Sequence, residues 1–94
     1  MALDLDNFKH INDTLGHNVG DQILIQTVTR INHCLRRDEG FARLGGDEFA
    51  VIIGGISNIN QIGMIANRIL TEVSKPFLHE GRTINCSLSI MCAI

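Results

Sequence analysis

The 94-residue sequence lacks several features that would place it in a broad protein class. No stretch approaches the roughly 18 consecutive apolar residues of a membrane-spanning helix. The first residues do not show the basic, apolar and small-residue succession of a secretory signal peptide. A net charge of -2, from 8 basic and 10 acidic residues, argues against nucleic acid as a partner. Repeats, low-complexity tracts and linkers are also absent, so we expect one small cytoplasmic domain.

Cysteine is scarce and shows no pairing pattern. The three cysteines are an odd number, and none belongs to a C-x-x-C motif. Cys86 and Cys92 stand in an apolar, strand-like run, and Cys34 stands in a helix-like one. Because 45% of the residues are hydrophobic, the chain can form a core, and we expect these thiols to be reduced within it.

Both ends of the sequence resemble interior segments of a larger domain. Met1 leads directly into a strand-like segment and Ile94 ends the chain inside another, whereas complete strands usually end in turn residues. We therefore expect residues 1–94 to be a single domain that lacks its first helix and its C-terminal strand and helix.

Hydrophobic periodicity predicts secondary structure in the order β-α-α-β-β-α-β. The expected segments are a strand at 1–5, a short helix at 8–15 capped by Asp6 or Asn7 and closed by Gly16, a helix carrying Leu24, Val28, Ile31 and Leu35, strands at 41–44 and 48–53, a helix carrying Ile62, Ile65, Ile69 and Val73, and a strand at 83–94. This order indicates an α+β, ferredoxin-like sandwich whose mixed sheet contains a central β-hairpin.

Acidic residues stand at the C-terminal end of the first strand and at the tip of the hairpin. If these strands are neighbours, Asp4 and the pair Asp47-Glu48 converge on one edge of the sheet. Carboxylates and a backbone carbonyl are the hard oxygen ligands that Mg²⁺ requires, and a cation would relieve the repulsion between adjacent acids. The alternative is a solvated turn. A calcium loop beginning at Asp4 is excluded, because Phe8 and Lys9 occupy positions that need oxygen and glycine.

Two further stretches favour nucleotide binding without requiring it. The turn before Phe8 and Lys9 enters a helix N-terminus, where free N–H groups attract phosphate, although a simple cap with a solvated lysine is the alternative. Asn12 and Asp21 flank a glycine-containing turn, and a carboxylate with an amide can distinguish guanine from adenine. Taken alone, Asp21 is better interpreted as a helix cap.

Together these motifs resemble the GGDEF domain of diguanylate cyclases. The resemblance rests on Asp4-Leu5-Asp6-Asn7-Phe8-Lys9, Ile11-Asn12-Asp13, Gly16-His17, Gly20-Asp21 and Arg43-Leu44-Gly45-Gly46-Asp47-Glu48-Phe49, and it extends over essentially the whole chain. It implies a nucleotidyl-cyclase or polymerase-palm-like fold. It also implies that two GTP molecules are condensed into cyclic di-GMP across a homodimer, each domain presenting one GTP.

The resemblance assigns roles to particular residues. It implies that Asp4 and Asp47 bind Mg²⁺ or Mn²⁺ by carboxylate and Leu5 by its carbonyl, and that Glu48, or Asp47 with the metal, helps to deprotonate the attacking 3′-hydroxyl. It places GTP against Asn12, His17, Asp21, Phe8, Lys9, Gly45 and Gly46. It further implies sensor or effector domains in a longer parent protein, with any membrane anchor outside this sequence.

Three departures from the family pattern bear on the expected activity and its regulation. The inhibitory product site Arg-x-x-Asp corresponds to Arg36 through Glu39, whose longer side chain makes product inhibition doubtful. Met91 stands where the family has glycine, and can crowd the neighbouring layer. The phosphate-binding Lys and Arg of the closing helix are not in the sequence, so we expect the isolated chain to be weakly active or inactive. A non-catalytic GGDEF module that binds GTP or cyclic di-GMP is the alternative.

Overall fold

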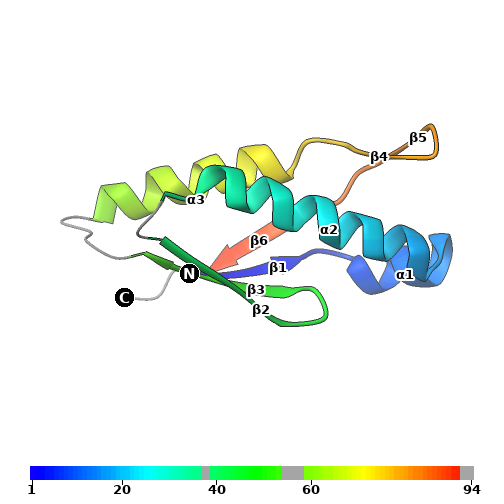
Figure 1. The fold of residues 1–94 in the computed structure, drawn as a ribbon, viewed down its shortest axis with the longest axis horizontal. Helices are drawn as coiled ribbons and strands as arrows, with labels where there is room; N and C mark the ends of the chain where they lie inside the picture. The colour runs from blue at the N-terminus through cyan, green and yellow to red at the C-terminus, as the bar shows by residue number, and fades with distance from the viewer. Residues whose placement is uncertain (37–38, 54–58, 92–94) are drawn as a thin grey trace.

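The computed structural model describes residues 1–36, 39–53 and 59–91 of the chain. Figure 1 shows an open sheet with two long helices across one of its faces. In chain order the elements are β1 (Ala2–Leu5), α1 (Phe8–Leu15), α2 (His17–Cys34), β2 (Glu39–Gly45), β3 (Glu48–Ile53), α3 (Ile59–Val73), β4 (Phe77–His79), β5 (Arg82–Ile84) and β6 (Leu88–Met91). The predicted α+β class is confirmed.

The main sheet has the strand order β2-β3-β1-β6, and every strand pair among the described residues is antiparallel. This is the ferredoxin-like arrangement, in which β3 lies between β2 and β1 and therefore separates two strands that run in the same direction. β1 separates β3 from β6 in the same way. The expectation of a mixed sheet is wrong, because parallel strands are present but are not adjacent within the described sheet.

The last predicted strand, residues 83–94, is divided in the structure. Its start belongs to β5, which pairs with β4 in a separate two-stranded ribbon, and its later part is β6. The ribbon turns through Glu80 and Gly81, whose φ values of 49° and 76° suit a tight two-residue hairpin. Residues 85–87 belong to no strand, and Cys86 and Ser87 bond instead to Asp6 in the turn after β1. Residues 92–94 lie outside the described part.

The core fills the space between the sheet and the helices α2 and α3. The residues at helical spacing that are buried there are Leu24, Ile31, Ile65, Ile69 and Val73, with Val28 and Leu35 packed against them. Phe49 of β3 is fully buried and stacks on Phe41 of β2, with ring centroids 5.5 Å apart. Cys34 and Cys86 are buried free thiols, as expected, whereas Cys92 lies outside the described residues.

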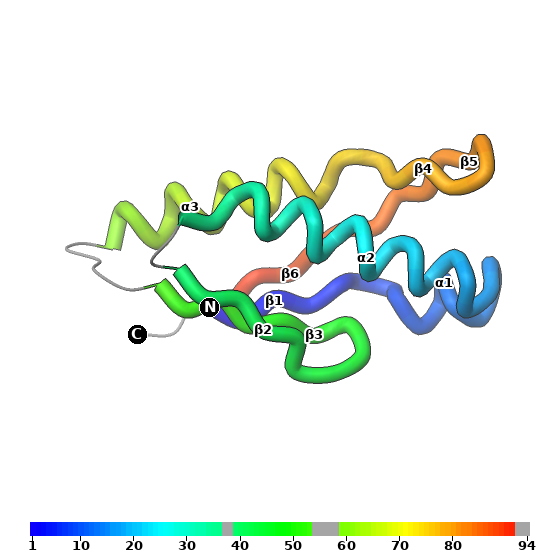
Figure 2. The backbone as a smooth tube through the Cα atoms, viewed as in Figure 1, coloured from blue at the N-terminus to red at the C-terminus, as the bar shows by residue number. Residues whose placement is uncertain are grey.

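The position of the two turns at one end of the sheet matters most for the site. Figure 2 traces the β2–β3 bend and the passage from β1 into α1, and both lie at the same end of the sheet.

None of the helices within the described ranges is long and apolar enough to cross a membrane.

Candidate functional site

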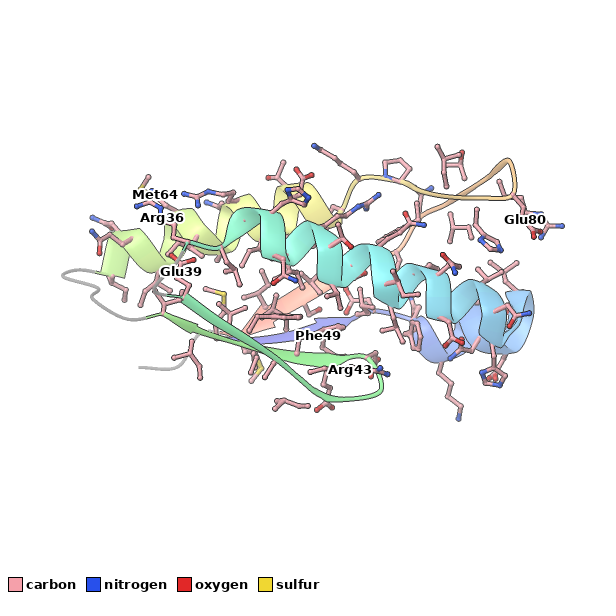
Figure 3. The ribbon with its side chains drawn as sticks, viewed as in Figure 1. Arg36, Glu39, Arg43, Phe49, Met64 and Glu80 are labelled. Carbon is pink, nitrogen blue, oxygen red and sulfur yellow. The ribbon has the colours of Figure 1, made fainter. Side chains whose placement is uncertain are left out.

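The tip of the β2–β3 hairpin is held by its own backbone and by one arginine. The strand register shifts between Arg43 and Gly45, and Gly46 has a φ of 35°, so the chain bends sharply before β3. The Arg43 guanidinium donates two hydrogen bonds to the Gly46 carbonyl, from Nε at 3.1 Å and from one terminal nitrogen at 2.8 Å. Figure 3 shows Arg43 at this bend. These two hydrogen bonds hold the backbone directly before Asp47 and Glu48.

The end of β1 lies directly beside that tip. Asp4 is paired with Glu48 of β3 on one side and with Ser89 of β6 on the other. The Leu5 N–H donates to the Asp47 carbonyl oxygen at 3.1 Å. The structure therefore brings Asp4 together with Asp47 and Glu48 at one edge of the sheet, although Asp4 is more than forty positions away from them in the sequence.

The acids at this edge disturb one another. Partial removal from water raises the pKa of Asp4, and the nearby Asp47 raises it further through its charge and a side-chain hydrogen bond; Glu48 and Asp6 add smaller contributions of the same sign. Neighbouring carboxylates disfavour ionisation unless a cation offsets their charges. The edge is thus electrostatically suited to a cation.

The donor set at this edge is small but chemically appropriate for a hard metal ion. Within the part of the chain that the structure describes, no three His, Cys, Asp or Glu side chains form a cluster able to hold a metal by themselves. Asp4 and Asp47 offer a carboxylate pair, and Leu5, the residue after Asp4, has a main-chain carbonyl. Such a set suits Mg²⁺ or Mn²⁺, which normally keep water or substrate phosphate in their remaining positions.

The crossing of α1 and α2 brings Asn12 against Gly20. A Cβ atom at Gly20 would lie only 1.7 Å from Asn12 Oδ1 and 2.8 Å from Asn12 Cγ, so the amide occupies the space that a side chain would take. Asn12 Oδ1 is buried and has no hydrogen-bond partner among the described residues. Asp21 follows on the exposed surface inside α2, whose N-cap is Gly16, so its interpretation as a helix cap is wrong.

The start of α1 differs from a side-chain-capped helix. Asn7 is the N-cap residue with a φ of 59°, but its side chain makes no capping hydrogen bond. Phe8 is buried in the core, and Lys9 is exposed. His17 is the exposed first residue of α2. The Phe8 side chain thus belongs mainly to the core.

Sequence reasoning missed the bonding of Asp6. Its carboxylate caps no helix but accepts hydrogen bonds from Ser87 and Ser89. An alternating Ser-x-Ser pattern at a strand start is the signal that was available, but its partner lies about eighty positions away. A hollow of about 350 Å³ adjoins this region and is lined in part by His10 and Cys86; neither Asp4 nor Asp47 lines it.

The residues at the expected product site lie at the other end of β2. Glu39 Oε2 accepts a hydrogen bond from the Arg36 main-chain N–H at 2.9 Å, and the Glu39 N–H donates to the Arg36 carbonyl at 3.1 Å. Figure 3 shows both residues far from the hairpin bend that carries Arg43. Residues 37–38 between them lie outside the described ranges.

The sequence is similar to that of known proteins over most or all of its length. The chain matches the family described as "Diguanylate cyclase, GGDEF domain" over residues 1–94. It is 41% identical over 95 residues to diguanylate cyclase TpbB of Pseudomonas aeruginosa, covering 100% of this chain and 22% of that protein. It is 47% identical over 77 residues to cyclic di-GMP phosphodiesterase PdeR of Escherichia coli, covering 82% of this chain and 12% of that protein. The chain thus spans less than a quarter of either relative.

Solved structures agree with the sequence match. The crystal structure of the GGDEF domain of TpbB superposes with a TM-score of 0.88 at 41% identity, covering 93% of this chain and 55% of that chain. The GGDEF domain of DgcB from Caulobacter crescentus, in complex with c-di-GMP, superposes with a TM-score of 0.84 at 29% identity, covering 94% and 53%. The chain therefore belongs to the GGDEF diguanylate cyclase family.

Proposed function

We propose that this chain is the catalytic domain of a diguanylate cyclase, which condenses two GTP molecules into cyclic di-GMP. The observation that carries the proposal is the meeting of Asp4 with Asp47 and Glu48 beside a bare glycine bend. An acidic edge of this kind is costly without a cation, and a triphosphate needs the same cation to neutralise its charge.

Asp4, Asp47 and the Leu5 carbonyl would hold Mg²⁺ or Mn²⁺. When bound, the metal supplies positive charge to the phosphates and lowers the pKa of a coordinated hydroxyl. Glu48 is exposed beside this pair and would accept the proton of the 3′-hydroxyl. That oxygen then bonds to the α-phosphorus of the other GTP as pyrophosphate leaves, and a second such step closes the ring.

The glycines at the tip support close approach by a nucleotide. A Cβ atom at Gly45 or Gly46 would meet nothing within 4 Å in the described part of the chain. Gly46 has the positive φ that favours glycine, but no positive φ occurs at Gly45. Neither crowding nor conformation within the chain therefore explains Gly45, whereas a ligand lying against the backbone does.

The guanine base would lie at the α1–α2 crossing. Asp21 would accept hydrogen bonds from the base, and the Asn12 amide beside Gly20 would make the complementary contact. His17 would lie close to the nucleotide. The start of α1, with the main chain of Phe8 and the Lys9 ammonium group, would face phosphate.

The reaction needs two GTP molecules, and we infer a homodimer in which each domain presents one. We also infer that the parent protein is longer, carries sensor or effector domains and works in the cytoplasm. Residues 1–94 cover 55% of the TpbB GGDEF-domain chain, and we infer that full turnover needs parts of the domain outside this range.

A second candidate is a GGDEF module that binds GTP or cyclic di-GMP without catalysis. One relative named above is a cyclic di-GMP phosphodiesterase, so membership of the family does not by itself require cyclase activity. The presence of Asp4, Asp47 and Glu48 at one edge favours catalysis, because a module that only binds does not need a base beside its metal ligands.

A product assay on the full parent protein separates these candidates. The unchanged protein should form cyclic di-GMP from GTP and Mg²⁺, and Asp47→Ala and Glu48→Ala should each abolish most of the turnover. Unchanged turnover in both variants would refute the proposed roles. GTP binding without product in the unchanged protein would support the second candidate.

A further inference from the structure

We propose that Asp6 is a positioning residue of the metal site, tied to β6 through Ser87 and Ser89, and not a metal ligand. This inference rests on the proposed function, since it concerns the aim of the Leu5 carbonyl and of Asp4. Two acids separated by one residue at a strand end could both be taken for ligands. The bonding of Asp6 distinguishes them.

Both oxygens of the Asp6 carboxylate are occupied. Ser89 Oγ donates to Asp6 Oδ1 at 2.6 Å, and Ser87 Oγ donates to Asp6 Oδ2 at 2.8 Å. Hydroxyl hydrogen bonds to an ionised carboxylate are short and strong at such distances. The carboxylate is thus directed to β6, on the side of β1 that faces away from the hairpin tip.

The main chain of Asp6 is held by the same segment. Its N–H donates to the Ser87 carbonyl at 2.9 Å, and its own carbonyl accepts from Cys86 Sγ at 3.4 Å. All four polar positions of this residue are therefore bonded to residues 86–89. These four hydrogen bonds fix the orientation of Asp6 and of the turn that follows β1.

The fixation of Asp6 sets the direction of the Leu5 carbonyl. The Leu5 C=O and the Asp6 N–H belong to one planar trans peptide, so they point in opposite directions. Because the Asp6 N–H points to β6, the Leu5 carbonyl points to the hairpin tip. The Leu5 N–H already reaches the Asp47 carbonyl on that side. Asp6 thereby aims the carbonyl at the edge where Asp4 and Asp47 meet.

The serine hydroxyls provide the test, because their removal leaves every carboxylate in place. Mn²⁺ binding to the 94-residue chain is measured by electron paramagnetic resonance of the free ion. We expect Ser87→Ala/Ser89→Ala to weaken Mn²⁺ binding by about tenfold, the range found for residues that orient metal ligands. Ser87→Thr/Ser89→Thr keeps both hydroxyls on exposed positions and should bind within about twofold of the unchanged chain.

A second readout reports the geometry without the metal. Hydrogen exchange of the Asp6 amide should accelerate in the double alanine variant and return to its slow rate in the double threonine variant. If the double alanine variant does not fold, Ser89→Ala alone is used, because it removes the shorter of the two bonds. Thermal unfolding identifies variants that are folded.

The outcomes separate this inference from the proposed function. Mn²⁺ affinity that is unchanged in the serine-to-alanine variants, yet lost in Asp47→Asn, overturns the positioning role and leaves the proposed metal site standing. Loss of binding in Asp6→Asn alone, with the alanine variants unaffected, makes Asp6 a ligand and also overturns the inference. A chain that binds no Mn²⁺ overturns both.

Discussion

The Thr27 hydroxyl is a polar group in an apolar environment, which lowers the stability of the fold. It is fully buried on the inner side of α2, and its Oγ1 has no hydrogen-bond partner among the described residues. Thr27→Val keeps the shape and removes the unpaired group, so we expect the free energy of unfolding to rise by about 1 kcal/mol. The measurement is urea denaturation.

Thr29→Val is the matched control for this prediction. Its hydroxyl lies on the exposed side of the same helix and donates to the Ile25 carbonyl at 3.0 Å. Valine there should leave stability unchanged or slightly lower. A Thr27→Val chain no more stable than Thr29→Val would contradict the cost assigned to the buried hydroxyl.

Cys86 couples stability to alkaline pH. Burial raises the pKa of its thiol to about 11 from the usual 9.0, and the charges of Asp6 and Asp47 add to the shift. The unfolded chain therefore loses this proton at a lower pH than the folded chain. The free energy of unfolding therefore falls as the pH rises from 9 to 11, by at most about 2 kcal/mol once solvent screening is allowed for.

Urea denaturation at pH 8 and pH 10.5 tests this coupling. Cys86→Ala should show a smaller decline between the two values than the unchanged chain. Some decline should remain, because burial also raises the pKa of Cys34. An equal decline in both proteins would show that Cys86 does not titrate as described.

At the residue scale, the sequence predicted where acids stand but not what each one bonds to. Asp4 lies near the end of β1 and Asp47 directly precedes β3, so their meeting followed from the hairpin being a neighbour of the first strand. The hydroxyl partners of Asp6 could not be predicted, because they depend on a register between β1 and β6 that no local pattern encodes. The contact between Asn12 and Gly20 likewise depends on the angle between two helices.

The α1–α2 crossing is sensitive to the side chain at Gly20. A Cβ atom there would overlap Asn12 Oδ1 and come within 3.3 Å of Phe8 Cζ. We expect Gly20→Ala to lower the free energy of unfolding by about 1–3 kcal/mol through overpacking. In the Asn12→Ala background the same change should instead raise it by up to about 1 kcal/mol, because alanine is the better helix former.

A double-mutant cycle by urea denaturation measures this coupling. Its four chains are the unchanged chain, each single variant and the double variant. A stabilising effect of Gly20→Ala with Asn12 present would show that the amide moves aside freely and that glycine does not hold its position.

The contact between Arg36 and Glu39 bears on the proposed product site. The Glu39 carboxylate accepts a hydrogen bond from the Arg36 main-chain N–H and is therefore already engaged. We expect weak binding of cyclic di-GMP, and about tenfold tighter binding, or about 1.4 kcal/mol, in Glu39→Asp, which has the length found in the family's Arg-x-x-Asp pattern. Isothermal titration of the 94-residue chain gives the affinity.

Arg36→Ala combined with Glu39→Asp controls for the arginine and should lose the gain. If the unchanged chain already binds cyclic di-GMP as tightly as Glu39→Asp, the extra methylene has no effect on this site.

At the element scale, prediction succeeded where periodicity is local. The residues that α2 and α3 bury recur at helical spacing, and β3 has the predicted bounds. The direction of neighbouring strands is not a local property, so the mixed sheet was wrong. The last strand was predicted as one run because β-branched and small residues continue through it, whereas the bonding of Cys86 and Ser87 to Asp6 interrupts it.

At the scale of the whole molecule, the topology explains why the site lies where it does. β1 is an inner strand between β3 and β6, so its last residues meet the hairpin tip on one side and the serine-bearing strand on the other. Figure 1 shows both long helices on one face, with the hairpin tip free at the end of the sheet. The acids therefore lie at the end of a sheet whose one face is packed on the core, and under the proposed function GTP would bind at this end.

The most direct test of the proposed metal site is the initial rate of cyclic di-GMP formation by the full parent protein as the Mg²⁺ concentration rises. The unchanged protein is compared with Asp47→Asn and Glu48→Gln. A metal ligand and a proton acceptor should differ in which parameter they change.

We expect Asp47→Asn to raise the half-saturating Mg²⁺ concentration by at least about tenfold, the equivalent of about 1.4 kcal/mol of lost binding. Glu48→Gln should lower the maximal rate and leave the half-saturating concentration where it is. An Asp47→Asn protein with the Mg²⁺ dependence and maximal rate of the unchanged protein would show that Asp47 does not bind the metal.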